Sequence, residues 1–175
     1  KNNKFELIYL LGSDKLNINK KDEFVIYQGS HGDKGAEIAD VILPSPAYTE
    51  QNGLFINLEG RVQECRKASY PPGESLEDWK IFNLILNSLK KERFCNNLDD
   101  LKKATLKEIK NFSDIDLLPK TVPKENKKIS SEFNNETISI NKIDYYFSNA
   151  IARASKTMSD CRRINSNLIE ERAKN

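Results

Sequence analysis

The sequence has little of the material from which metal and redox sites are built. Its 175 residues include three cysteines, Cys65, Cys95 and Cys161, and a single histidine, His31. The cysteines are widely separated, no CxxC pair occurs, and no second histidine is present to complete a set of four ligands. We therefore expect no zinc or iron–sulfur site within this chain.

The chain also lacks a strong net charge and a long apolar run. It contains 28 Lys and Arg residues against 26 Asp and Glu residues, for a formal net charge of +2. No broad basic field is therefore available to bind nucleic acid. No stretch approaches the roughly 18 consecutive apolar residues that a membrane helix requires. We expect neither a nucleic-acid partner nor a direct membrane span.

Three short apolar runs, each closed by a glycine or a proline, predict buried strands. They cover residues 5–11, 24–27 and 41–43. Apolar runs of this kind, without alternation, are typical of parallel strands that are covered on both faces. Residues 33–40, between the second run and the third, leave room for about two helical turns. The sequence therefore predicts a parallel sheet with a tight crossover.

A predicted hairpin and two predicted helices follow. Residues 54–58 and 61–65 flank Glu59-Gly60, which is typical of a glycine-turned hairpin. Ser75 lies three residues before Asp78, the spacing of a capping box, so we expect a helix to begin there. Asn97 is expected to cap a second helix.

The last third of the chain changes character. Residues 119–142 are rich in Lys, Asn and Pro and predict a solvated linker. Residues 143–175 return to apolar character and predict a helical extension that docks on the domain, with Asn149 as a helix cap.

Together these elements predict an α/β fold in which residues 1–118 form the C-terminal part of a doubly wound parallel sheet with a hairpin. Sheets of that kind have about five or six strands, whereas this sequence supplies three. Three strands would leave apolar edges open. We therefore expect another polypeptide to complete the sheet.

A glycine-rich loop follows the second predicted strand, in the segment YQGSHGDKG at residues 27–35. Ligands of parallel α/β sheets bind beyond the carboxyl ends of the strands, where this loop lies. Its glycines would let backbone N–H groups approach an anion, and Lys34 could neutralise a phosphate. The spacing is GxxGxxG, however, and not the dinucleotide pattern GxGxxG. The alternative is a tight turn with positive φ angles at the glycines.

Three charged or titratable features have a functional and a structural interpretation. His31 could act as an acid or a base, but it lacks a partner nucleophile, so we expect no catalytic residue. Glu59 and Arg61 could clamp a bound group; we favour an ion pair that holds the hairpin. Arg153 could meet a phosphate, although an arginine in this setting more often anchors an interface.

Several segments together resemble a known family. They are VIYQGSHGDKGAEIADVILP at 25–44, AYTE at 47–50, NLEGRVQ at 57–63 and EDWK at 77–80. They are similar to the molybdopterin-oxidoreductase-like domain of the largest iron–sulfur subunit of respiratory complex I. The segments IDYY at 143–146 and IARASKTM at 151–158, with Cys161, resemble the C-terminal signature of the same subunit.

The resemblance implies a domain that carries no cofactor of its own. In that family the iron–sulfur clusters belong to an N-terminal cysteine-rich domain, and the complex I members resemble molybdenum enzymes without retaining the cofactor. The loop with Gly29, His31, Gly32 and Gly35 would then be a relic of a pterin-dinucleotide cradle, now used as a turn. Iron–sulfur clusters and FMN are expected in partner subunits.

The resemblance also implies a scaffold role in the NADH-oxidising peripheral arm, in support of NADH-to-quinone electron transfer. The expected partners are the N-terminal iron–sulfur part of the same subunit and other peripheral-arm subunits. Either the gene is split or the chain is a piece of a longer one. The expected location is the matrix side of the mitochondrial inner membrane, or alternatively the cytoplasmic face of a bacterial inner membrane.

Two other functions stay open on the sequence alone. One is a true molybdopterin-dependent oxidoreductase of the formate-dehydrogenase kind, in which a β-rich cap would stand where this chain has helices and a linker. The other is a small-ligand-binding module, which would require a complete sheet. Molybdenum or tungsten bound in the assembled subunit would favour the enzyme.

Overall fold

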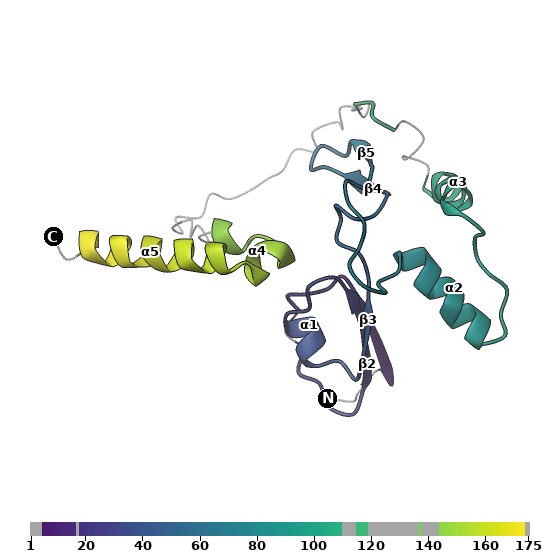
Figure 1. Cartoon of the computed structure of the whole chain (residues 1–175), viewed down its shortest axis with the longest axis horizontal. Helices are drawn as coiled ribbons and strands as arrows, with labels where there is room; N and C mark the ends of the chain where they lie inside the picture. The colour runs from purple at the N-terminus through teal and green to yellow at the C-terminus, as the bar shows by residue number, and fades with distance from the viewer. Residues whose placement is uncertain (1–4, 17, 110–114, 119–136, 138–143, 174–175) are drawn as a thin grey trace, which may run out of the picture. The chain divides into compact units, whose positions relative to one another are not determined.

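The computed structural model describes residues 5–16, 18–109, 115–118, 137 and 144–173 (Figure 1). The chain divides into two compact units, Lys1–Pro119 and Lys120–Asn175. The elements of the first unit are β1 (Leu7–Leu11), β2 (Phe24–Gly29), α1 (Lys34–Glu37), β3 (Val41–Pro44), β4 (Gly53–Ile56), β5 (Val62–Cys65), α2 (Asp78–Ser88) and α3 (Leu98–Glu108). Those of the second are η2 (Tyr145–Phe147), α4 (Ala150–Ala154) and α5 (Lys156–Ala173).

The three predicted strands form a parallel sheet in the order β1-β2-β3. Leu7 pairs with Phe24 at the start of β1 and β2, and Ile26 pairs with Val41 at the start of β3. The crossover between β2 and β3 contains the short helix α1 (Figure 1). The prediction of a parallel sheet with a tight crossover is therefore confirmed.

The core of the first unit lies on one face of this sheet. Leu10, Val25 and Tyr27 are buried there, with exposed fractions of 5%, 0% and 1%. The partly buried residues packed against them come from strand β1, from the β1–β2 connection and from α1 and its end: Ile8, Ile18, Ala36, Ile38 and Ala39. Both connections of the sheet therefore cover the same face.

Asp40 ties the beginning of β2 to the beginning of β3. Its Oδ2 accepts the backbone N–H of Val25 at 2.8 Å, and its Oδ1 lies 2.6 Å from Lys20 Nζ. The Lys20 ammonium, followed by the Val25 N–H, lowers the pKa of Asp40 below its ordinary value of 3.8. The ionised carboxylate is thus the form that the fold favours.

We expect the contribution of Asp40 to stability to depend on pH. Because folding lowers its pKa, the contribution is complete above the ordinary value of about 3.8 and is lost as the pH falls through the lower, folded value. Asp40→Asn should therefore speed hydrogen exchange of the Val25 amide at pH 7. The difference between Asp40→Asn and the unaltered protein should shrink below about pH 3.8. A difference that stays constant across this range would contradict the assignment.

The hairpin of β4 and β5 is antiparallel, as predicted, with Ile56 opposite Val62. The side chain of Asn57 holds its turn, since Oδ1 accepts the N–H of Glu59 at 3.0 Å and that of Arg61 at 2.9 Å. The Arg61 guanidinium donates instead to the carbonyl of Asp116 at 2.9 Å. The favoured ion pair between Glu59 and Arg61 is therefore wrong, because an asparagine closes the turn and the arginine reaches residue 116.

The predicted start of the helix after Ser75 is also wrong. Helix α2 begins at Asp78, and its N-cap residue Glu77 makes no side-chain capping bond. A capping box needs the Asp78 carboxylate to return to residue 75. That carboxylate instead accepts Gln28 Nε2 at 2.6 Å. The Ser75 hydroxyl is buried without a hydrogen-bond partner among the described residues.

The start of α3 agrees with the prediction from the sequence. Asn97 caps α3 as predicted, with its side chain accepting the N–H of Asp100 at 2.9 Å. Asn83 of α2 is buried and binds the segment before α3. Its Nδ2 donates to the Cys95 carbonyl at 2.8 Å, and its Oδ1 accepts the Phe94 N–H at 3.3 Å.

In the second unit, Asn149 caps α4 as predicted by accepting the N–H of Ala152 at 2.8 Å. The helical extension is interrupted at Ser155, which is extended and whose hydroxyl accepts the Met158 N–H at 3.4 Å. Arg162 of α5 binds Asp144 at 2.7 Å and lies over the Phe147 ring. These contacts tie α5 to η2.

The predicted linker at 119–142 lies outside the described residues except for Thr137. The docking of residues 143–175 on the first unit stays a prediction. In the part of the chain that the structure describes, no helix is both long and apolar enough to cross a lipid bilayer.

Candidate functional site

The glycine loop follows β2 at the carboxyl end of the sheet, and its interior contains a tyrosine. Tyr27 is buried, and its hydroxyl donates to Asp14 Oδ1 at 2.5 Å and lies 3.2 Å from the Gly32 carbonyl oxygen. Burial, followed by the hydrogen bond to Asp14, raises the pKa of Tyr27 above its ordinary value of 10.0. The phenol is therefore held in its protonated, donating form.

Two glycines of the loop make room for this tyrosine. A Cβ atom on Gly29 would lie 2.2 Å from the Tyr27 hydroxyl oxygen. A Cβ atom on Gly35 would lie 2.7 Å from the Ser13 carbonyl oxygen and 2.9 Å from the Tyr27 ring. Gly32 differs, since its φ of 77° lies in the left-handed region. The prediction of positive φ angles therefore holds for Gly32, whereas Gly29 and Gly35 accommodate Tyr27 and Ser13.

Gly29 and Gly35 do not leave open the space that a phosphate cradle needs. A phosphate cradle needs free space beside its glycines, so that backbone N–H groups can approach the anion. Here the side chain of Tyr27 and the carbonyl of Ser13 occupy the space beside Gly29 and Gly35. The space beside these two glycines is therefore not open to a phosphate.

His31 and Lys34, the two polar loop residues considered in the sequence analysis, lie at the surface. His31 is exposed, and its Nδ1 lies 2.9 Å from the hydroxyl of the adjacent Ser30. The Lys34 side chain is exposed, and its backbone N–H donates to Asp33 Oδ1 at 2.9 Å. The structure thus brings Gly29, Gly32 and Gly35 together around Tyr27 and leaves His31 outside that group.

A buried chain of polar groups runs from the sheet to α2. Gln28 has an exposed fraction of 0%. Its Oε1 accepts the Tyr9 hydroxyl, and its Nε2 donates to Asp78 Oδ1 at 2.6 Å. Burial, with a smaller effect of Asp78, raises the pKa of Tyr9. Each polar group of Gln28 therefore has a partner, as a buried amide requires.

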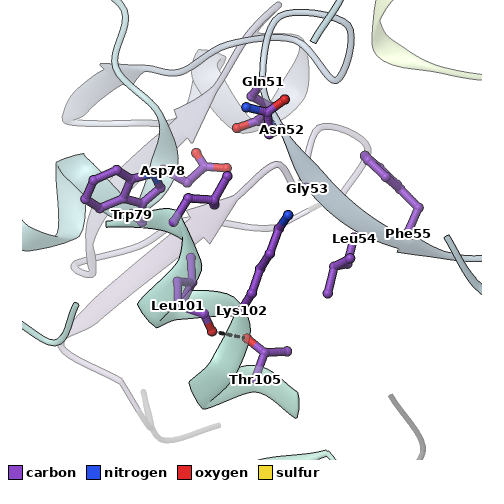
Figure 2. Close-up of a pocket in the computed structure, with 11 residues that line it drawn as sticks. Gln51, Asn52, Gly53, Leu54, Phe55, Asp78, Trp79, Leu101, Lys102 and Thr105 are labelled. Carbon is purple, nitrogen blue, oxygen red and sulfur yellow. Dashed lines mark hydrogen bonds between the residues drawn. The ribbon is translucent and has the colours of Figure 1, made fainter. Parts of the chain in front are cut away.

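A hollow of about 320 Å³ lies between β4, the start of α2 and α3. Figure 2 shows Asp78 and Trp79 on one wall and Leu54 and Phe55 on the other. Its remaining lining residues are Gln51, Asn52, Gly53, Leu98, Leu101, Lys102 and Thr105.

The charged groups of this hollow are already paired. Lys102 forms an ion pair with Glu64 and thereby lowers the pKa of Glu64. Asp78 accepts the hydrogen bond from Gln28. The rest of the wall is largely apolar, so the hollow offers packing surface rather than a reactive group.

The cysteines do not converge with other ligand types within the described residues. Cys95 is buried, whereas Cys65 and Cys161 are half-buried, and all three are free thiols. No group of three or more His, Cys, Asp or Glu side chains suited to hold a metal ion occurs among the residues that the structure describes.

The sequence pattern does not identify Tyr27 and Gln28 as the residues that organise this region, because it places Tyr27 at the end of the predicted strand and Gln28 directly after it. A signal is present, since a glutamine directly follows the apolar run and precedes the first glycine of the loop. A polar residue in a buried parallel strand needs a partner. Its partners Tyr9 and Asp78, however, cannot be identified from spacing.

Two protein-family models match successive segments of the chain. A family model described as molybdopterin oxidoreductase matches residues 1–88. A second, which describes the C-terminal region of the G subunit of NADH-ubiquinone oxidoreductase, matches residues 108–161.

Individual relatives match across nearly the whole chain. The G subunit of the NADH-quinone oxidoreductase of Rickettsia felis is 44% identical over 159 residues, which cover 89% of this chain and 23% of that protein. The NADH-ubiquinone oxidoreductase 75 kDa subunit of Reclinomonas americana is 37% identical over 168 residues, 93% of this chain and 24% of that protein. The mitochondrial 78 kDa subunit of Candida albicans is 39% identical over 178 residues, 90% of this chain and 24% of that protein.

This chain therefore spans about a quarter of the length of the curated relatives that it matches. The relatives are G subunits and 75–78 kDa subunits, so the resemblance to the largest iron–sulfur subunit of respiratory complex I is confirmed. Because the first family model covers residues 1–88 of the 175, the chain belongs to the molybdopterin oxidoreductase family.

Proposed function

We propose that the chain is a scaffold part of the NADH-oxidising peripheral arm of respiratory complex I. It supports NADH-to-quinone electron transfer without itself holding a redox group or a catalytic residue. The observation that carries the proposal is the succession of two family matches on one chain, molybdopterin oxidoreductase at 1–88 and the C-terminal region of the G subunit at 108–161. A true molybdopterin-dependent oxidoreductase would account for the first match alone.

The absence of a cofactor is part of the proposal and is supported by the glycine loop. The Tyr27 side chain fills the space beside Gly29 and Gly35. We therefore assign Gly29, Gly32 and Gly35 a structural role. Iron–sulfur clusters and FMN belong, in this proposal, to partner subunits, the first of which is the N-terminal iron–sulfur part of the same subunit.

The proposed location is the matrix side of the mitochondrial inner membrane. The relatives include mitochondrial subunits from Candida albicans and Neurospora crassa and bacterial ones from Rickettsia. The cytoplasmic face of a bacterial inner membrane is the alternative that the bacterial relatives support.

Purification from the native source tests the proposal. The assembly that contains this chain should oxidise NADH. Mass spectrometry should also find a cluster-bearing polypeptide, either as a separate chain or as part of one longer chain. Elemental analysis should find iron but no stoichiometric molybdenum or tungsten. Molybdenum or tungsten at one atom per chain would favour the formate-dehydrogenase-like enzyme and contradict the scaffold proposal.

His31→Asn tests the proposal that the loop is structural. The side chain is exposed beside Ser30, so NADH-to-quinone turnover should stay within about twofold of the unaltered complex, whereas loss of a general acid or base typically costs about 10²–10⁴-fold. Turnover should be measured on intact complex, with subunit content checked by native electrophoresis. A hundredfold loss with normal assembly would make His31 a functional residue.

A further inference from the structure

The two faces of the β1-β2-β3 sheet are covered unequally. Leu10, Val25 and Tyr27 lie on the face under α1. Because side chains alternate along a strand, Leu7 and Leu11 of β1 lie on the opposite face, together with Phe24, the register partner of Leu7. Their exposed fractions are 53%, 48% and 46%. This opposite face therefore carries an apolar patch of Leu7, Leu11 and Phe24.

Helix α2 covers only part of this opposite face. The Tyr9 and Phe82 rings stack with their centroids 5.5 Å apart, and Gln28 binds Asp78. These contacts bury Gln28 but leave Leu7, Leu11 and Phe24 open. Parallel sheets are normally covered on both faces, so the patch needs a covering element that the described residues do not supply.

The two edges of the sheet also differ. β3 has four residues and ends at Pro44, whose carbonyl accepts the N–H of Leu76 at 3.4 Å. A short strand that ends in proline is typical of a protected edge. β1 has the sequence LIYLL, without a charge, a proline or a glycine. Such a strand is typical of a sheet interior, so the β1 edge is the one built to receive another strand.

The handedness of the strand connections indicates which strands the covering element would belong to. The connections from β1 to β2 and from β2 to β3 step in one direction and cover the face of Tyr27. Crossovers of parallel strands are right-handed in about 98% of cases, so helices on the opposite face belong to strands that step in the opposite direction. Consecutive strands that step away from β1, on the side opposite to β2, would by the same rule place their connecting helices on the face of Leu7 and Phe24.

We propose that the β1 edge and the patch of Leu7, Leu11 and Phe24 form the docking surface for the segment that precedes the matched region in the family's subunits. That segment adds a parallel strand along β1 and covers the patch with apolar side chains. The inference rests on the proposed function, which supplies the occupant. About three quarters of each relative's length lies outside the match, and the match ends in a C-terminal family region.

Site-specific photo-crosslinking in the assembled complex tests the proposal. p-Benzoylphenylalanine would replace Leu7 or Phe24, with Ile42 and Leu58 as controls. Ile42 lies at the β3 edge with an exposed fraction of 54%, and Leu58 is fully exposed in the hairpin turn. Adducts from positions 7 and 24 should map to the preceding segment of the subunit, whereas positions 42 and 58 should give none with that segment.

Carbene footprinting of the unaltered complex gives a second readout that does not depend on any variant. Labelling of Leu7 and Phe24 should fall at least fivefold below that of Leu58. Labelling equal to that of Leu58, or adducts from positions 7 and 24 only with other subunits, would overturn the docking surface while the chain remains a complex I component. If the chain does not purify with an NADH-oxidising assembly, the docking surface and the proposed function both fail.

Discussion

Tyr27→Ala is expected to be the most disruptive single substitution in the first unit. The ring is buried and its hydroxyl binds Asp14, so the substitution removes both packing and a hydrogen bond. Truncating a buried aromatic residue to alanine typically costs about 3–5 kcal/mol. Tyr27→Phe, which removes the hydroxyl alone, should cost about 1–3 kcal/mol. Hydrogen exchange of the β2 amides in the assembled complex measures both losses.

A double-mutant cycle with Gly29 tests whether the loop is built around Tyr27. Gly29→Ala places a methyl group 2.2 Å from the Tyr27 hydroxyl oxygen and should cost about 1–3 kcal/mol, as overpacking does. In the Tyr27→Ala background that cost should nearly vanish. Gly53→Ala is the matched control, because a methyl group there meets Phe55 at an ordinary 3.7 Å. Equal costs of Gly29→Ala in both backgrounds would contradict the role given to Tyr27.

The chain expressed alone is expected to lack a cooperative melting transition. It leaves Leu7, Leu11 and Phe24 exposed, and among the described residues its parallel sheet has three strands with an open β1 edge. Far-UV circular dichroism should show helix, while the thermal transition should be broad and the dye ANS should bind. Co-expression with the preceding segment should sharpen the transition, since a partner that binds only the folded state stabilises it.

The outcome that would contradict this prediction is equally definite. A monodisperse monomer of residues 1–175 with a sharp, two-state transition would mean that the first unit needs no completing strand. It would also remove the reason for a docking surface on β1. Sedimentation velocity together with scanning calorimetry would distinguish that monomer from a self-associated form.

Local signals in the sequence predict the elements that depend on neighbouring residues. Asn97 and Asn149 cap their helices as expected, because each asparagine acts on an amide three residues away. The capping box at Ser75 fails because the Asp78 carboxylate binds Gln28, fifty residues earlier in the chain. Spacing cannot reveal such a competitor.

The glycine loop of the candidate site is a second case in which spacing along the sequence does not reveal the contacts. Its position at the carboxyl end of β2 could be predicted from the strand pattern. Its content could not, because the side chain that fills it, Tyr27, belongs to the strand and turns into the loop through Asp14 and Gly32. The interruption at Ser155 was accessible in principle, since a serine three residues before Met158 has the spacing of a helix cap.

The wall of the hollow at the start of α2 contains an intrinsic fluorophore, Trp79. Trp79 is the chain's single tryptophan, and it is half-buried with its indole N–H donating to Glu77 Oε2 at 2.8 Å. The Lys80 ammonium lies 5.3 Å from the centre of its ring. All tryptophan emission of the separated chain therefore originates where the sheet, through Gln28 and Asp78, meets the helix. A red shift of that emission would report water entering this junction.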